Sequence, residues 1–371
     1  MSENESETAD ETIDASGKIV TPGWIDMHVH FREPGFEHKE NIYSGSRAAA
    51  AGGITSVMAM PNLKPVPDNP ETLANIYEIA RKNSVVNYFQ TASITVGENG
   101  AELTDFSSLK KAGAIAFTDD GKPVVHESMM LQAMQKAKDA GVLLSLHEEE
   151  EETLVKRDLR LLETVRTRLH FQHLSLHNSI DAVRRAKVQG WQVTCETAPH
   201  YFALAVNDVE LKGTNAKMNP PLKTHQDRER VLWALEGGTI DVIATDHAPH
   251  MVAEKAQVFD KAPNGIIGLE TLVGLCVTHL IDKRILTWPK LVEKVCVNPA
   301  RILGLKNKGT LTVGSDADIT IIDAEKDWIV DANKFFSKAR NCPWDGEKLK
   351  GKTVATIVKG RVIFDGNNIL R

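Results

Sequence analysis

Short apolar runs alternate with longer amphipathic stretches along most of the chain. The short runs are rich in β-branched residues, as strands are, whereas stretches such as 70–80 and 179–189 carry apolar residues at helical spacing. Eight runs of the strand type follow one another, at 24–32, 54–60, 87–95, 114–118, 142–147, 169–174, 192–197 and 241–245. Eight strand–helix repeats predict an α/β fold of the (β/α)8 TIM-barrel type.

The two ends of the chain have a different pattern. After Gly309, apolar runs separated by Gly and Asp turns predict strands at 311–313, 317–322, 328–330 and 353–364, and residues 13–20 read as one more strand. We therefore expect a small, reduced β-sandwich domain formed by residues 13–22 and 309–371, beside a barrel of residues 23–308. Residues 1–12 carry five acidic and no basic side chains, which predicts a disordered acidic tail.

Composition narrows the class of protein. With 371 residues, of which 42% are hydrophobic, the chain can bury one large core. A net charge of −6 without a Lys/Arg cluster argues against binding to nucleic acid, and no apolar run is long enough to span a membrane. The four cysteines lack C-x-x-C spacing, so we expect neither disulfides nor a thiolate metal site, and a cytoplasmic location.

The first barrel strand carries candidate metal ligands. Asp26, His28 and His30 are two residues apart, so on a strand they point to one side. Two imidazoles on one face can bind a metal, although a buried strand with two satisfied histidines explains this pair alone about equally well.

The other strand ends favour the metal site. Five of the other seven strands end in polar residues of the kinds that bind metals or substrates, namely Asn62, Asp119, Asp120, His147, His170, His173, Asp246, His247 and His250. The C-terminal ends of barrel strands form one face, on which the active sites of such barrels lie. The four best-placed imidazoles and two carboxylates are more than one tetrahedral ion needs, so we expect two metal ions.

The segments around these residues resemble the dihydroorotase form of the amidohydrolase superfamily. Residues 22–35, PGWIDMHVHFREPG, are similar to the opening signature of that family, and residues 244–250, ATDHAPH, are similar to its second signature. Residues 217–223, KMNPPLK, and 265–271, GIIGLET, also match, and the resemblance spans nearly all of 13–366.

The resemblance implies a zinc-dependent enzyme that reversibly hydrolyses the cyclic amide of (S)-dihydroorotate to N-carbamoyl-L-aspartate in pyrimidine biosynthesis. It implies two Zn²⁺ per chain, one bound by His28, His30 and Asp246 and the other by His147 and His173, with Asp120 as the bridge. Many relatives bridge with a carboxylated lysine at the end of strand four. Residues 114–121 contain no lysine, which resembles the bacterial branch that uses aspartate.

The resemblance also implies roles around the substrate. Asp246 would be the catalytic acid and base, and the substrate would be contacted by Arg32, Asn62, Asn219, His250 and Gly265. A planar guanidinium such as that of Arg32 suits a carboxylate through two parallel hydrogen bonds.

Three sets of polar residues receive a structural interpretation. We expect His170 in the core or an interface, and His200 and His247 as hydrogen-bond partners behind the ligands. The glutamates at 148–152 are expected to form the solvated first turn of a helix.

Two departures from the family pattern keep alternatives open. Only residues 1–27 precede His28, so the C-terminal strands are expected to lack partners, which suggests a homo-oligomer, a reduced sandwich or a shortened chain. Asn264 stands where the family has Phe, near the expected substrate ring. The alternatives are another cyclic amidohydrolase, of the hydantoinase or allantoinase kind, and a partner-dependent or non-catalytic subunit that scaffolds aspartate transcarbamoylase.

Overall fold

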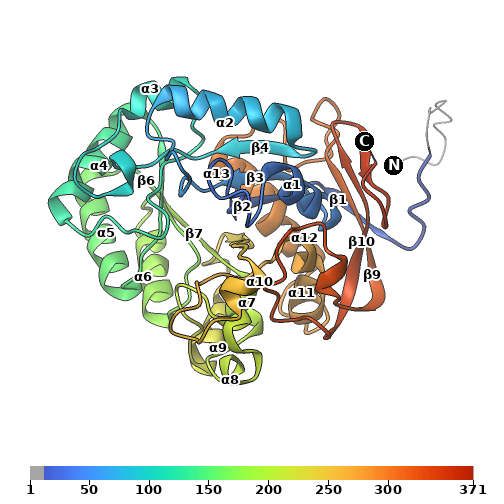
Figure 1. Cartoon of the computed structure of the whole chain (residues 1–371). Helices are drawn as coiled ribbons and strands as arrows, with labels where there is room; N and C mark the ends of the chain where they lie inside the picture. The colour runs from blue at the N-terminus through green and yellow to red at the C-terminus, as the bar shows by residue number, and fades with distance from the viewer. Residues whose placement is uncertain (1–11, 371) are drawn as a thin grey trace.

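Seven parallel strands and one strand-like segment form the ring at the centre of the molecule, which a computed structural model describes for residues 12–370 (Figure 1). One parallel sheet contains β2 (Trp24–Val29), β3 (Ile54–Ala59) and β4 (Asn87–Gln90). The other contains β5 (Leu143–Leu146), β6 (Arg168–Phe171), β7 (Val193–Thr197) and β8 (Val242–Ile243). The predicted acidic tail falls on residues 1–11, which lie outside the described residues, and on the exposed Thr12.

Two sets of hydrogen bonds close the ring. On one side the segment 114–118 joins β4 to β5, because the Ile115 amide donates to the Gln90 carbonyl at 3.0 Å and the Phe117 amide donates to the Leu143 carbonyl at 2.9 Å. On the other side the His30 amide donates to the His247 carbonyl at 2.9 Å. The predicted (β/α)8 barrel is confirmed, and only its fourth strand is reduced to isolated bridges.

Helices surround the strands, as the sequence pattern predicts (Figure 1). The predicted helix at 70–80 is α2, which runs over Pro70–Asn83 and begins where the Asn69 side chain accepts a hydrogen bond from the Thr72 amide. The other α-helices are α1 (Ile42–Ala51), α3 (Phe106–Lys111), α4 (Glu127–Ala140), α5 (Glu151–Val165), α6 (His177–Val188), α7 (Pro199–Ala203), α8 (Asp208–Lys212), α9 (His225–Glu236), α10 (Val252–Lys255), α11 (Leu272–Cys276), α12 (Trp288–Val292) and α13 (Asn298–Leu303).

The two ends of the chain form one antiparallel sheet. Its strands are β1 (Ile19–Pro22), β9 (Ile319–Ile329), β10 (Lys348–Val358) and β11 (Arg361–Phe364), in the order β1-β9-β10-β11. Some predicted bounds are wrong: the strand expected at 13–20 begins only at Ile19, and the runs at 317–322 and 328–330 belong to one strand, β9. The expected strand at 311–313 does not form, because this segment lies open to solvent with Val313 fully exposed.

The expectation that the C-terminal strands lack partners is wrong for the two long strands. Strand β9 pairs with β1 and β10, with Ile19 opposite Ile322, and β10 also pairs with β11. The division of the chain into a barrel of residues 23–308 and a small β domain remains a proposal. Buried hydrogen bonds connect the two parts, since the Thr320 hydroxyl donates to the Gly53 carbonyl at 2.6 Å.

The five glutamates at 148–152 differ in exposure, and Glu152 is half-buried. Glu149 and Glu150 are exposed as predicted, whereas Glu148 and Glu151 are buried, so the solvated turn is wrong for these two. Glu148 lies before the helix, where its buried carboxyl faces that of Asp158, whereas Glu151 is the first residue of α5. The Glu151 carboxylate accepts hydrogen bonds from the Ser175 hydroxyl at 2.5 Å and the Leu176 amide at 2.9 Å.

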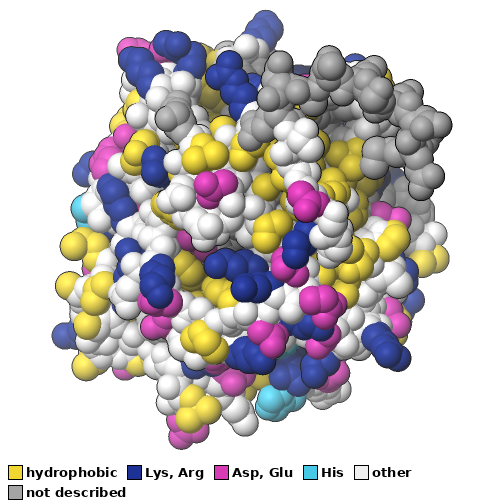
Figure 2. Space-filling view, turned by 90° about the vertical axis from the view of Figure 1, so that its right-hand side faces the viewer, with side chains coloured by type: hydrophobic (Ala, Val, Ile, Leu, Met, Phe, Trp, Pro, Cys, Tyr) yellow, Lys and Arg dark blue, Asp and Glu magenta, His cyan; other side chains and the backbone are white. Residues whose placement is uncertain are grey.

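The outer surface carries mixed charge on the side of the small sheet. Figure 2 shows basic and acidic side chains intermixed there, with hydrophobic side chains between them. None of the described helices combines the length and the apolar character that a membrane crossing requires.

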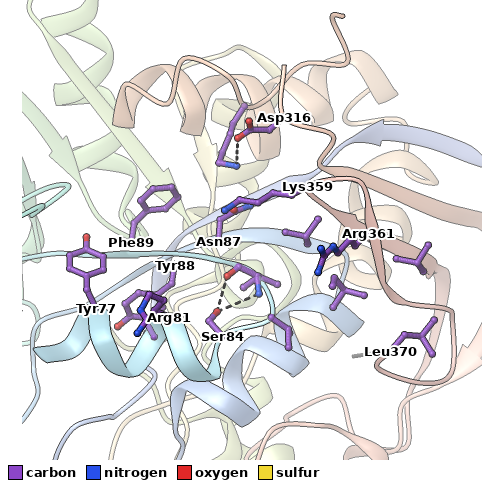
Figure 3. A pocket seen from close by; sticks show the side chains of 17 residues that line it. Tyr77, Arg81, Ser84, Asn87, Tyr88, Phe89, Asp316, Lys359, Arg361 and Leu370 are labelled. Carbon is purple, nitrogen blue, oxygen red and sulfur yellow. Dashed lines mark hydrogen bonds and ion pairs between the residues drawn. The ribbon is translucent and has the colours of Figure 1, made fainter. Parts of the chain in front are cut away.

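A cleft of about 1020 Å³ lies at the junction of barrel and sheet, between α2, β4 and the β10–β11 hairpin (Figure 3). Beside it, the buried Asp318 carboxylate accepts hydrogen bonds from the Asn87 side chain at 2.9 Å, the Lys308 ammonium at 2.6 Å and the Lys359 amide at 2.8 Å. Asp318 therefore joins a barrel strand to the sheet. None of the predicted site residues lines this cleft.

Replacing Asp318 by alanine should lower the free energy of unfolding by about 3 kcal/mol, because three buried or half-buried donors lose a charged acceptor. Chemical denaturation measures the change. Asp316→Ala is the matched control, since Asp316 is more exposed and its carboxylate pairs only with Lys308 among the described residues. Equal effects of the two substitutions would show that Asp318 does not tie the two parts together.

Candidate metal centre and active site

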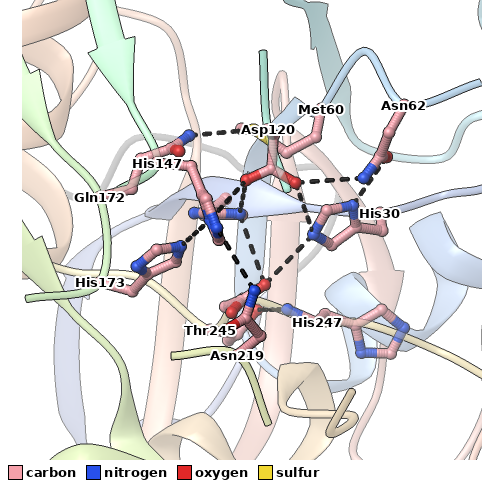
Figure 4. A network of polar contacts seen from close by, with 12 residues as sticks. His30, Met60, Asn62, Asp120, His147, Gln172, His173, Asn219, Thr245 and His247 are labelled. Carbon is pink, nitrogen blue, oxygen red and sulfur yellow. Dashed lines mark hydrogen bonds and ion pairs between the residues drawn. The ribbon is translucent and has the colours of Figure 1, made fainter. Parts of the chain in front are cut away.

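The C-terminal ends of the barrel strands meet around a cavity of about 290 Å³. His28 lies in β2, His30 directly after it, Asp120 after the segment 114–118, His147 after β5 and His173 shortly after β6. Asp246 lies shortly after β8. Figure 4 shows side chains from these separate elements pointing toward one another. The structure therefore brings all six residues predicted as metal ligands to one buried place.

Asp120 lies between two groups of imidazoles. Its Oδ1 is 3.3 Å from His28 Nε2 and 3.7 Å from His147 Nδ1, and its Oδ2 is 3.5 Å from His30 Nε2. A carboxylate in this position can bind one cation with each oxygen, as a bridge between two metal ions does.

Asp246 faces the first group and His173 the second. Asp246 Oδ1 lies 3.2 Å from His30 Nε2 and 3.4 Å from His28 Nε2. On the far side of Asp120, His147 Nδ1 lies 2.8 Å from His173 Nε2. These distances leave the ring nitrogens and carboxylate oxygens facing a common space.

The donor atoms fit a metal site. Three overlapping groups of side chains have their donor atoms within 4.8 Å of one another: His28, His30 and Asp120; His28, His173 and Asp246; and Asp120, His147 and His173. His28 Nε2 and Asp120 Oδ1 are buried and have no hydrogen-bond partner among the described residues. Burying such polar atoms without a partner lowers the stability of the folded protein, and a bound cation would be such a partner. Imidazole and carboxylate groups are ligands that zinc binds.

The electrostatics prepares these groups for a cation. Burial alone would raise the pKa of Asp120 and of Asp246, but the neighbouring imidazoles of His28 and His30 outweigh it and lower both values. Burial lowers the pKa of His147, and it lowers the pKa of His173 to about 3. His28 differs from these two: burial would lower its pKa, but Asp246 and Asp120 outweigh burial and raise it, so a cation that binds there replaces a proton. Ionised carboxylates and neutral imidazoles are the forms that bind metal ions.

Glu196 fixes the orientation of His28 and was missed in the sequence. Its Oε1 lies 2.8 Å from His28 Nδ1 and its Oε2 3.2 Å from His170 Nε2. Because a carboxylate only accepts, His28 Nδ1 carries the proton and Nε2 is free to bind a metal. The signal in the sequence was a glutamate inside the apolar strand at 192–197. His170 lies in the core, as predicted.

Asn62 connects two of the predicted ligands. Its Oδ1 lies 3.0 Å from His30 Nδ1, and its Nδ2 donates to Asp120 Oδ2 at 3.1 Å. Asn62 lines the cavity as well, so it can orient the ligands in addition to the predicted contact with substrate.

Arg32 and the neutral His250 form one end of the cavity, and Arg32 gives that end its positive charge. The buried Arg32 Nε has no hydrogen-bond partner among the described residues. The Lys39 ammonium donates to His250 Nδ1 at 3.3 Å and pairs with Glu254 at 2.9 Å. Burial, with Arg32 and Lys39 next in effect, lowers the pKa of His250 to about 3, so the ring is neutral with its proton on Nε2. Both side chains can donate to an anion in the cavity.

Asn219 and Gly265 occupy different positions around this end. Asn219 lines the cavity, and its Nδ2 lies 3.5 Å from His147 Nε2. Gly265 packs behind His250, where an added Cβ would lie 2.4 Å from the Ala248 carbonyl oxygen and 2.7 Å from His250 Cδ2. The neighbouring Asn264 lines the cavity.

The other candidate histidines lie behind the ligands. His247 Nδ1 accepts a hydrogen bond from the Gly268 amide at 3.2 Å, and its Nε2 is 3.5 Å from Glu40 Oε2. His200 is buried, and burial lowers its pKa to about 4. Neither belongs to a group of side chains that could hold a metal among the described residues.

Backbone strain is concentrated at the site. Seven non-glycine residues of the described chain have positive φ, and three of them are Arg32 at 62°, His173 at 30° and Asp246 at 48°. Such conformations cost about 1–3 kcal/mol each and persist where the surrounding structure enforces them. The fold therefore holds these three side chains in directions that an unstrained backbone would not give.

Comparison with known proteins agrees with this geometry. The model of the amidohydrolase family matches residues 19–363, so the chain belongs to that family. A protein of Geobacter metallireducens named dihydroorotase is 46% identical over 95% of this chain and 89% of its own length. A protein of Clostridioides difficile with the same name is 43% identical over 98% and 91%. Within the family, the chain groups with the dihydroorotases.

Solved structures show the same fold. The L-hydantoinase (dihydropyrimidinase) of Arthrobacter aurescens superposes with a TM-score of 0.92 at 28% identity, over 99% of this chain and 90% of that one. The D-hydantoinase (dihydropyrimidinase) of a Thermus species has a TM-score of 0.87 at 25% identity, over 99% and 90%.

Replacing Glu196 by glutamine should weaken zinc binding about 10- to 100-fold, because a neutral amide with one acceptor oxygen replaces the charged carboxylate that bonds both His28 and His170. Competition with a chromogenic chelator measures the affinity. Glu151→Gln, which alters a buried carboxylate outside the ligand groups, should leave zinc affinity unchanged. Unchanged affinity in Glu196→Gln would contradict the orienting role.

Proposed function

We propose that the chain catalyses the reversible hydrolysis of the cyclic amide of (S)-dihydroorotate to N-carbamoyl-L-aspartate, the reaction of a dihydroorotase in pyrimidine biosynthesis. The observation that carries this proposal is the partly unpaired, charged Arg32 in the same cavity as the metal-ligand groups. Dihydroorotate has both features that such a cavity needs, an amide to hydrolyse and a carboxylate outside the ring. The two dihydroorotase relatives described above support the assignment.

We further propose that the cofactor is two Zn²⁺ per chain. His28, His30 and Asp246 would hold one ion and His147 and His173 the other, with Asp120 between them. When bound, zinc supplies Lewis acidity and lowers the pKa of water at the site. Two of the three overlapping donor groups share Asp120, and together the groups support two ions better than one.

The proposed role of Asp246 is proton transfer. Its carboxylate is buried and ionised, and it lies beside the ligand imidazoles without an Arg or Lys partner among the described residues. It can accept the proton of the attacking water and deliver it to the ring nitrogen that leaves.

The proposed substrate contacts follow from the charged end of the cavity. Arg32 and His250 would donate to the carboxylate of the substrate, and Asn219 would contact the ring from the side of His147. Asn62 has both ends of its amide bonded to His30 and Asp120, so its contribution is mainly to orientation. Gly265 would act through the space that it leaves for His250.

The second candidate is a cyclic amidase of the hydantoinase kind. The likeness in fold to the Arthrobacter aurescens L-hydantoinase favours it. A neutral ring, however, would offer no carboxylate to accept a hydrogen bond from the buried Arg32 Nε. The higher identity to dihydroorotases also favours the first candidate.

Predictions about partners and location remain proposals. A homo-oligomer and a complex with aspartate transcarbamoylase can be tested by light scattering and by assays with and without that enzyme. The complete ligand set argues against a purely scaffolding subunit, which would not need Asp246. Four free, buried cysteines support a reducing, cytoplasmic location.

Mixing the zinc-loaded protein with dihydroorotate should produce the ultraviolet change of ring opening. Asp246→Asn should reduce kcat about a thousandfold, because the proton acceptor is lost. Zinc content is measured on both proteins by mass spectrometry. An active Asp246→Asn enzyme would contradict the proposed proton transfer, and an inactive parent with two ions bound would contradict the function.

Arg32→Met should raise KM for dihydroorotate about 100-fold and leave the hydrolysis of dihydrouracil, which lacks the carboxylate, unchanged. Steady-state kinetics with the two substrates measures the effect. Arg301→Met, at an exposed arginine outside the cavity, is the control. If Arg32→Met affected both substrates equally, the proposed carboxylate contact would be wrong.

A further inference from the structure

One wall of the cavity is a segment without helix or strand. Residues 256–264 follow α10 and lead to Gly265, and their last member, Asn264, lines the cavity. A segment of this kind has no ladder of backbone hydrogen bonds to hold it, so its carbonyl groups need other partners.

Lys255 provides partners from the inside. Its side chain is buried, with 4% of the residue exposed. Its ammonium donates to the carbonyl oxygens of Gly265 at 2.9 Å, Pro263 at 3.0 Å and Lys217 at 3.4 Å. An ammonium group has three donors and no acceptor, so three carbonyls satisfy it completely.

Lys217 binds the same segment from the other side. Its ammonium donates to the carbonyl oxygens of Phe259 at 2.6 Å, Ala262 at 2.8 Å and Asp260 at 3.2 Å. Its own carbonyl accepts from the Gly265 amide at 2.9 Å and from Lys255. The two lysines therefore bind five carbonyls of residues 259–265 and are linked to each other.

The contacts continue to the cavity. The Gly265 carbonyl also accepts from Asn341 Nδ2 at 3.0 Å, and Asn341 Oδ1 accepts from the His250 amide at 3.2 Å. Met218 and Asn219, which follow Lys217 directly, line the cavity. Three pieces of cavity wall, at 218–219, 248–250 and 264, thus depend on the same set of hydrogen bonds.

Both lysines also lack a carboxylate partner among the described residues. The positive charge of Lys255 adds to those of Arg32 and Lys39 around His250, where Glu254 is the nearby acid, and Lys217 lies beside Lys255. The basic side chains of this group favour an anion in the cavity, while Asp120, Asp246, Glu254 and Glu40 act on Arg32 with the opposite charge.

We propose that Lys255 and Lys217 are positioning residues for the substrate: they hold residues 259–265 so that Asn264, His250 and Asn219 are already in place when an anionic cyclic amide binds. This inference rests on the proposed function. Neither lysine reaches the ligand groups, so their effect is on binding of the ring and its carboxylate and not on the attack at the amide.

The test is Lys255→Met, which keeps the length of the side chain and removes its three donors. We expect KM for dihydroorotate to rise about tenfold with kcat within twofold of the parent, since preorganisation of the wall is lost. Amide hydrogen exchange of residues 259–265 should become about tenfold faster, with zinc content and exchange of the barrel strands unchanged. Lys261→Met, at an exposed lysine of the same segment with no side-chain contact among the described residues, should match the parent.

Several outcomes overturn the proposal. Unchanged KM and unchanged amide exchange in Lys255→Met would show that the segment needs no such support. A decrease in kcat together with an equal decrease in zinc content would place the effect at the metal centre. If circular dichroism shows that Lys255→Met does not fold, the same two measurements are made on Lys217→Met, because Lys217 contacts the segment from the other side. A parent without dihydroorotase activity would refute the proposed function, and the exchange measurement would still decide whether the lysines hold the segment.

Discussion

Burial of ionisable groups at the mouth of the barrel constrains the structure around it. Asp120 and Asp246 are buried together with four imidazoles, and burial disfavours every charge among them. They are tolerated because the imidazoles and carboxylates face one another, and because further side chains set the direction of each ring. Glu196 does so for His28 and Asn62 for His30. Parallel strands supply this arrangement, since their ends converge on one rim.

Much of this could be predicted from local patterns. The spacing of His28 and His30 places them on one side of a strand, and strand–helix repeats place each strand end on the same rim. Hence the barrel, a small β domain made from both chain ends and the grouping of the six candidate ligands followed from the sequence, whereas the pairing of the C-terminal strands did not. The errors lie where solvent or tertiary contacts decide: residues 311–313 have strand-like composition but no neighbouring strand, and Glu148 and Glu151 are drawn inward by packing.

The residues that were missed act over long distances in sequence. Glu196 and His28 are 168 residues apart, so no local pattern indicates that they meet. Lys255 and Lys217 bind backbone carbonyls, which every residue has, and the sequence does not mark which carbonyls are left free by an irregular segment. The strained backbone at Arg32, His173 and Asp246 is equally invisible, because it is enforced by the surrounding structure.

The fold alone does not select the substrate, since it is shared with hydantoinases that superpose over 99% of the chain. What distinguishes this cavity is the charge opposite the candidate ligands. Arg32 lowers the pKa of its neighbour His250, while its own Nε has no acceptor in the protein. A buried guanidinium nitrogen without an acceptor lowers the stability of the folded protein unless a bound anion accepts its hydrogen bond. The substrate that accepts this hydrogen bond must therefore be an anion as well as a cyclic amide, and dihydroorotate is such a molecule.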